Sequence, residues 1–194
     1  MAFHNKKIGF GVTGSHCTLE EIIPVMDALI ERNAELFPIV SPSVENLDTR
    51  FGKAEDWITA IENVCKKKVK RNIAEVEPFG PNKLLDIMVI APCTGNTMAK
   101  LSRGIIDTSV LMAAKSQLRN QNPVVLSVST NDGLGINARS LAIMLNTKNV
   151  YLVPFHQDKP YEKPNSLVAR IDLIIPTIEA ALNNYQLQPI LSIS

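Results

Sequence analysis

Four polar segments of this sequence each follow an apolar run, and together they have the residue types that bind an anionic ligand. The first runs from Gly9 to His16, where glycines and the Ser15 hydroxyl directly precede an apolar helical pattern. Glycines let the backbone turn sharply, and the free N–H groups of a helix start attract anions. A plain tight turn is the alternative. The spacing is not GxGxxG, so a dehydrogenase-type dinucleotide site is not supported.

The second segment, Ser41-Pro42-Ser43, places hydroxyls after another apolar run, although serines beside a proline also form ordinary turns. The third runs from Ala91 to Asp107. In it a Thr-Gly-Asn-Thr cluster, starting at Thr94, opens a helix, and a simple N-cap explains only one of its three polar side chains.

The fourth segment runs from Ser127 to Asn137, and its Asn131-Asp132-Gly133 is also a good turn sequence. Each segment alone is a weak signal. Because the carboxyl ends of parallel strands lie along one edge of a sheet, we expect all four segments to line one ligand crevice.

The elements that position these segments alternate between strand and helix patterns along the chain. This alternation predicts an α/β fold, a three-layer doubly wound parallel sheet, in a single domain over residues 1–194. The predicted strands are Ile8–Val12, Glu35–Val40, Asp86–Ala91, Pro123–Val128 and Val150–Val153, with a weaker one at Ile73–Val76.

Helical periodicity predicts helices over residues 19–30, 54–65 and 166–182. Thr18 and Glu21 have the spacing of a capping box. The stretch Phe155 to Asn165 is the most loop-like and suits a lid or a contact arm.

Composition excludes several classes of protein. A formal net charge of +1 argues against a nucleic-acid binder, and the basic run Lys66 to Arg71 is interpreted as a solvated helix end. Three cysteines without CxxC spacing predict no disulfide framework and no metal site. No segment resembles a signal peptide or a membrane span, so we expect a cytoplasmic protein without a membrane partner.

Two of these polar segments resemble those of a known protein family. The segments Gly11 to Ser15 and Ala91 to Lys100 resemble the two signature segments of the flavoprotein family of flavin-dependent cysteine decarboxylases. Within that superfamily, Thr13 to Thr18 and Pro92 to Thr97 are most similar to the family of dipicolinate synthase B chains from spore-forming bacteria.

The resemblance implies a flavodoxin-like fold with an FMN-type site. By position, Gly14 and Ser15 hold the phosphate with Ser41, while Thr94, Asn96 and Thr97 line the crevice and Ser129 to Asn131 close its other side. The full set of expected cofactor-binding residues is Gly11, Thr13, Gly14, Ser15, His16, Ser41, Pro92, Thr94, Asn96, Thr97, Ser129, Thr130 and Asn131.

Two departures from the decarboxylase pattern matter. The decarboxylases place a histidine near the position that Pro78 occupies here, and their Pro-Ala-Met-Asn segment is Val128-Ser129-Thr130-Asn131 in this chain. Without that histidine the usual proton-handling group is missing, so we do not expect a cysteine decarboxylase.

No residue is identified as catalytic from the sequence. His16 and Cys93 are the candidates: His16 as an acid, a base or a phosphate donor, and Cys93 as a thiol in the ligand-facing turn. Lys100 and Arg103 are candidate substrate-binding residues that could neutralise a dicarboxylate, with solvated helix cations as the alternative.

The resemblance implies an oxidoreductase subunit acting in the mother cell of a sporulating bacterium. With an A chain that carries a nicotinamide cofactor, NADP, it would oxidise dihydrodipicolinate or its hydroxylated tetrahydro precursor to dipicolinate. Homo-oligomers are also implied. The alternatives are a flavin-dependent decarboxylase or prenylated-flavin synthase, and a subunit that binds a phosphate ligand without chemistry.

Overall fold

The computed structural model describes residues 3–192, and its centre is a parallel sheet in the order β2-β1-β3-β4-β5. These strands are β1 (Lys7–Val12), β2 (Glu35–Val40), β3 (Ile87–Cys93), β4 (Val124–Thr130) and β5 (Val150–Leu152). The five main predicted strands are therefore confirmed, with ends shifted by up to two residues. The chain changes direction across the sheet between β1 and β3, which is where doubly wound sheets bind ligands.

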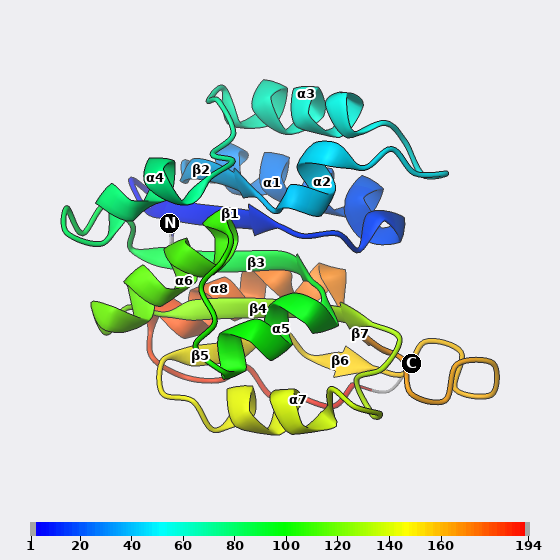
Figure 1. The fold of residues 1–194 in the computed structure, drawn as a ribbon. Helices are drawn as coiled ribbons and strands as arrows, with labels where there is room; N and C mark the ends of the chain where they lie inside the picture. Colours follow the sequence, from blue (N-terminus) through cyan, green and yellow to red (C-terminus); the bar gives the residue numbers. More distant parts are fainter. Residues whose placement is uncertain (1–2, 193–194) are drawn as a thin grey trace.

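Helices cover both faces of the sheet, as the alternation predicted. On one face α1 (Leu19–Glu31) and α8 (Ile174–Leu182) pack on the strands, and α3 (Ala54–Cys65) packs against α1 and β2. On the other face lie α5 (Gly95–Ser102), α6 (Ser109–Arg119) and α7 (Ala138–Leu145) (Figure 1). The remaining helices are short: η1 (His16–Thr18), α2 (Pro42–Asn46), α4 (Ile73–Val76), η2 (Glu77–Phe79) and η3 (Ile171–Leu173).

The core lies between these layers. All seven residues of β3 are buried, as are five of the seven in β4, so both faces of the central strands are covered. A strand covered on both faces exposes neither side to solvent, which explains its continuous apolar sequence. No helix among residues 3–192 is long and apolar enough to cross a membrane.

Two further short strands extend the sheet at the carboxyl end of β4. They are β6 (Phe155–His156) and β7 (Leu167–Ala169), and β7 pairs antiparallel with Ser129 and Thr130. The prediction of one helix over residues 166–182 was therefore wrong in its first third. Leu167 and Ala169 are buried while Val168 is half-buried, an alternation with the period of a strand.

Two local predictions were also wrong. Residues Ile73–Val76 form α4 instead of a strand, because Asn72 and Glu75 make a capping box: the Asn72 side chain accepts from the Glu75 N–H at 3.1 Å, and Glu75 accepts from the Asn72 N–H. The expected capping box at Thr18 is absent, because the Thr18 hydroxyl donates to the Ser15 carbonyl at 2.9 Å instead.

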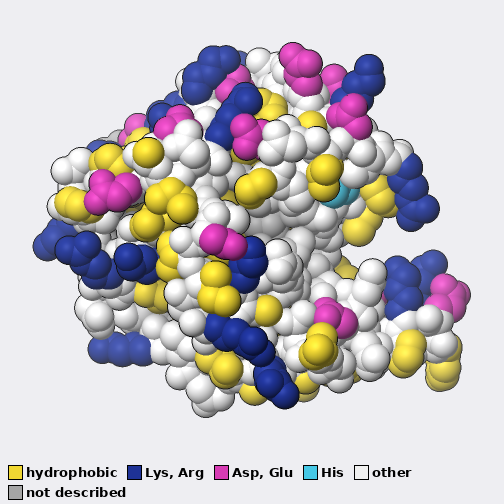
Figure 2. All heavy atoms as spheres, viewed as in Figure 1, with side chains coloured by type: hydrophobic (Ala, Val, Ile, Leu, Met, Phe, Trp, Pro, Cys, Tyr) yellow, Lys and Arg dark blue, Asp and Glu magenta, His cyan; other side chains and the backbone are white. Residues whose placement is uncertain are grey.

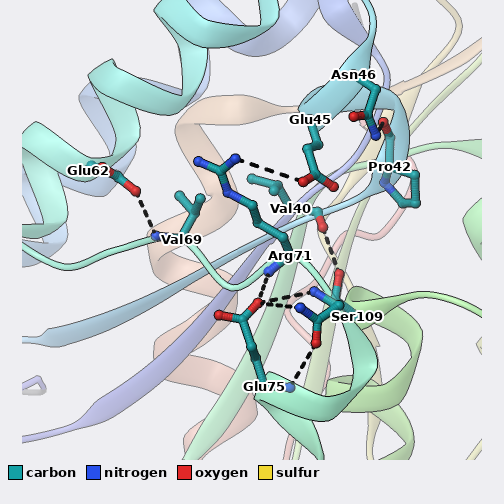
Figure 3. A network of polar contacts seen from close by, with 10 residues as sticks. Val40, Pro42, Glu45, Asn46, Glu62, Val69, Arg71, Glu75 and Ser109 are labelled. Carbon is teal, nitrogen blue, oxygen red and sulfur yellow. Dashed lines mark hydrogen bonds and ion pairs between the residues drawn. The ribbon is translucent and has the colours of Figure 1, made fainter.

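The basic run lies mostly beyond the helix it was assigned to. Helix α3 ends at Cys65 and only Lys66 caps it, in the left-handed conformation. The following cations meet acidic side chains: Lys67 is 2.6 Å from Glu35, and Arg71 lies between Glu45 and the α4 cap (Figure 3). Most of the run is neutralised locally, which leaves little charge for an external polyanion.

One buried hydrogen bond fixes the carboxyl end of β2. The Ser109 hydroxyl, at the start of α6, donates to the Val40 carbonyl at 2.6 Å (Figure 3). Ser109 is buried, so the bond is shielded from water. It holds the strand end directly before Ser41.

Replacing Ser109 by alanine removes this bond and leaves the Val40 carbonyl without that donor. We expect the S109A substitution to lower the free energy of unfolding by about 1 kcal/mol, measured by urea denaturation. The control is Ser102→Ala, whose hydroxyl bonds only to Ala99 in its own helix. Equal stabilities of the two variants would contradict the role given to Ser109.

Candidate functional site

The first turn is tied to the third strand by one buried hydroxyl. Thr13 Oγ1 donates to the Pro92 carbonyl at 2.7 Å and accepts from the Thr94 N–H at 3.0 Å. Thr13 is buried, and so is Pro92. These two expected cofactor residues thus act from behind the site, because they hold the turn after β1 against the turn after β3.

Ser15 links the same turn to the end of β4. Its hydroxyl is 2.7 Å from the Ser129 hydroxyl, although 114 residues separate them in the chain. The Ser15 N–H bonds to the Thr13 carbonyl, so the hydroxyl is the group that Ser15 offers to a ligand. The first, third and fourth predicted polar segments are therefore in contact at the carboxyl ends of β1, β3 and β4.

The turn after β2 reaches the site from the other side of Gly14. The Ser41 and Ser43 hydroxyls are 2.9 Å apart, and a Cβ built on Gly14 would collide with the Ser43 hydroxyl. The same Cβ would lie 3.6 Å from His16 Nε2. Only glycine leaves room here, so Gly14, His16, Ser41 and Ser43 form one polar cluster at the ends of β1 and β2.

The start of α5 is built from the third segment. Thr94 is its N-cap and accepts from the Thr97 N–H at 3.2 Å, with the two hydroxyls 3.0 Å apart. A Cβ on Gly95 would lie 2.5 Å from the Thr130 hydroxyl, so glycine is required where α5 meets the β4 turn. Thr97 is buried, which removes it from direct contact with a ligand of this region.

These turns enclose a cavity of about 460 Å³ at the carboxyl ends of the strands. Six expected cofactor residues line it: Gly14, Ser15, Thr94, Ser129, Thr130 and Asn131. Gly11, Thr13, Ser41 and Pro92 lie behind or beside it. Asn96, Lys100 and Arg103 line a neighbouring cavity between α5 and α7.

Several wall residues carry no signal of their role in the sequence. Asp158 and Lys163 line the cavity from the loop between β6 and β7, and Cys17 lines it from η1. The loop itself was expected as a lid or contact arm, and Figure 1 shows it projecting from the carboxyl edge of the sheet. The pairing of β7 with β4 brings the charged residues of this loop to the cavity, and sequence periodicity did not predict that pairing.

Burial affects the titration of two groups in this region. It lowers the pKa of His16, so the imidazole is neutral near pH 7 and does not act as a cation. Burial alone raises the pKa of Asp158, but the Ser166 hydroxyl and the Lys163 ammonium outweigh it, and the net pKa is lowered. The carboxylate is therefore ionised.

One buried polar atom beside the cavity and one in the cavity wall have no hydrogen-bond partner among the described residues. They are Nδ1 of His16 and Oδ1 of Asp158. An orphaned buried polar atom is costly unless a ligand or water satisfies it. The Asp158 oxygen lines the cavity and, as an anionic acceptor, suits a ligand N–H or hydroxyl, whereas the glycine and hydroxyl walls suit the phosphate.

A larger cavity, about 670 Å³, lies between α1 and the β7–η3–α8 segment. It contains His156 and none of the expected cofactor residues. The hydroxyl- and glycine-lined cavity has the chemistry expected of a cofactor site, so size does not decide between them. Within residues 3–192, no three His, Cys, Asp or Glu side chains gather as metal ligands.

Comparison with known proteins identifies the family. The flavoprotein family model matches residues 2–137. The B subunit of dipicolinate synthase from Bacillus subtilis (strain 168) is 50% identical over 186 residues, covering 96% of this chain and 93% of its own.

Solved structures agree with the fold. The crystal structure of the dipicolinate synthase B subunit from Bacillus halodurans superposes with a TM-score of 0.92 at 46% identity, covering all of both chains. The FMN-dependent cysteine decarboxylase SpaF superposes with a TM-score of 0.68 at 16% identity, covering 94% of this chain and 98% of its own. This second similarity shows the fold alone, which confirms the flavodoxin-like prediction. The chain belongs to the flavoprotein family, and its similarity to dipicolinate synthase B subunits extends over nearly its whole length.

Proposed function

We propose that this chain is a subunit of a dipicolinate synthase in a sporulating bacterium, where it binds FMN at the cavity between the turns of β1, β3 and β4. With an A chain that carries NADP, it takes part in the oxidation of dihydrodipicolinate, or its hydroxy-tetrahydro precursor, to dipicolinate. The proposal extends to a homo-oligomer acting in the cytoplasm of the mother cell. The product and the existence of a partner subunit are inferred from the names of the relatives, and the substrate and NADP from the family resemblance.

One observation carries the cofactor proposal: turns from three strands are bonded into a single wall. Thr13 joins the β1 turn to the β3 turn, and the Ser15–Ser129 pair joins it to the β4 turn. A preorganised wall of hydroxyls and close backbone suits a phosphorylated cofactor. A bound flavin would supply the two-electron chemistry that this chain's own side chains lack.

In this arrangement the chain's residues bind and orient. The Ser15 hydroxyl and the backbone at Gly14 would contact the phosphate, with Ser41 and Ser43 packed behind Gly14. Asn131 is exposed and lines the same cavity, so its amide can bond to a ring edge. The ionised Asp158 can accept from a ligand hydroxyl or N–H.

Neither candidate catalytic residue is suited to act on a ligand in the cavity, Cys93 as a thiol or His16 as an acid, a base or a phosphate donor. Cys93 is fully buried, and burial raises the pKa of its thiol to about 12, so the sulfur stays protonated. His16 is a neutral imidazole that lies on the Ser43 side of Gly14 and does not line the cavity. Proton transfer is therefore assigned to the partner chain or solvent, which also favours a purely binding subunit as the second candidate.

Removal of the Ser15 hydroxyl tests the site. We expect Ser15→Ala to weaken FMN binding about 10-fold or more, because a hydrogen bond to a charged group contributes about 1.5 kcal/mol or more, and quenching of flavin fluorescence measures the affinity. Ser102→Ala is the matched control, because Ser102 lies on α5 outside the cavity. An S15A affinity equal to that of the control would place the phosphate elsewhere.

Cysteine labelling tests the assignment of the three thiols. At pH 8 iodoacetamide should modify Cys17 in the folded protein and spare Cys65 and Cys93, because burial raises the pKa of both to about 12 and leaves roughly one thiolate in 10⁴. FMN should slow the labelling of Cys17, whose sulfur is 3.7 Å from the Ser15 hydroxyl. Peptide mass spectrometry reads the outcome, and fast modification of Cys93 would reopen its catalytic role.

Reconstitution separates the candidate functions. Co-expressed with an A chain, this protein should form dipicolinate at a rate that falls when FMN is removed and returns when FMN is added. If dipicolinate formation requires this chain but its rate does not depend on FMN, the second candidate, a subunit that binds a ligand without chemistry, is favoured. Formation by the A chain alone would overturn the proposal.

A further inference from the structure

We propose that the cavity between α5 and α7 binds the carboxylate-bearing ring compound on which the complex acts. This inference rests on the proposed function and names the place of its substrate. The cavity measures about 430 Å³ and is separate from the cofactor cavity. The third and fourth polar segments of the sequence contribute walls to both cavities.

A cation at the end of α5 can hold an anionic group at that end of the cavity. Arg103 is the C-cap residue of α5, it is exposed, and among residues 3–192 its guanidinium forms no ion pair. Lys100 lines the same cavity, but its ammonium is already 2.6 Å from Asp107. Arg103 is therefore the residue that is free to hold a carboxylate, and its planar guanidinium matches that group in geometry. Of the two expected substrate-binding residues, Arg103 keeps that role.

The cavity also has an acidic end. Both oxygens of Asp132 accept from the Asn137 amide, at 2.9 and 3.0 Å, and the Thr130 hydroxyl donates to the same carboxylate. A Cβ on Gly95 would lie 2.9 Å from Asp132, which places the acid at the first turn of α5. Arg103 follows eight residues later, about 12 Å along the helix axis at 1.5 Å per residue. A ligand carboxylate thus lies toward Arg103 and away from Asp132.

Apolar side chains supply the faces for a ring. Ile136 is 80% exposed and Ile105 is 44% exposed, and they line the cavity from different segments of the chain. Figure 2 shows hydrophobic and basic side chains intermixed over α5 and α7. Exposed apolar residues beside a free cation suit a compact ring that carries carboxylates, since such a molecule needs both kinds of contact.

The cavity adjoins the cofactor cavity. Gly95 and Thr130 line both, so the two cavities share a wall where the Thr130 hydroxyl packs against Gly95. A ring bound here lies beside the ligand of the neighbouring site. An oxidation between ring and cofactor requires such proximity.

The test uses dipicolinate as the probe, titrated into the full chain by calorimetry at low ionic strength without divalent cations. Ala99→Phe fills the cavity from the middle of α5 and should abolish saturable binding. Arg103→Gln should weaken it about tenfold, corresponding to about 1.4 kcal/mol. Arg119→Gln, an exposed arginine at the end of α6, is the matched control and should bind like the wild type.

FMN affinity is measured on the same variants and should be unchanged, which also shows that they are folded. Wild-type affinity for dipicolinate in the Ala99→Phe variant, or no binding to the wild type, would overturn the inference even if FMN binds and the complex is active. Conversely, binding that responds to Ala99→Phe and Arg103→Gln would support the cavity even if FMN fails to bind. A change in oligomeric state on Ile136→Ser, by sedimentation, with dipicolinate affinity unaltered, would assign the apolar wall to contacts between copies and would also overturn it.

Discussion

The site depends on the hydroxyl of Thr13, which is buried between two turns that are 79 residues apart. By donating to one backbone group and accepting from another, it holds the β1 and β3 turns at a fixed separation. A buried hydroxyl with both bonds made keeps its neighbours in register, because loss of either partner would strand a polar group away from water. The distance between the β1 and β3 walls of the proposed cofactor cavity is therefore set by this residue.

Much of the fold could be predicted because its signals are local. The apolar run at Ile87–Ala91 has the composition of a doubly covered strand, and it is one. The short segments were harder. Ile73–Val76 is apolar and β-branched at both ends, yet the cap formed by Asn72 and Glu75 makes it a helix. Leu167–Ala169 is a strand because β4 offers it a partner, and three residues carry too little periodicity to show this.

The candidate site was predictable to the extent that parallel strands gather their carboxyl ends. This rule brought Ser15, Thr94 and Ser129 together, as expected. It did not distinguish residues that face the cavity from those that brace it, such as Thr13, nor did it separate Asn96 and Arg103 into a second cavity. Which cavity a residue faces depends on the direction of its side chain. That direction is set by packing in the fold, and no local pattern of the sequence predicts it.

The pairing of β7 with the end of β4 has a consequence for how such a site can diversify. The loop between β6 and β7 contributes Asp158 and Lys163 to one wall, while a short antiparallel ladder closes it at its base. Residues can be exchanged or inserted at its tip without disturbing the ladder or the strand ends behind it. Substitutions in this one surface loop can therefore change which ligand binds on that side, while the hydroxyl-lined wall at the strand ends stays unchanged.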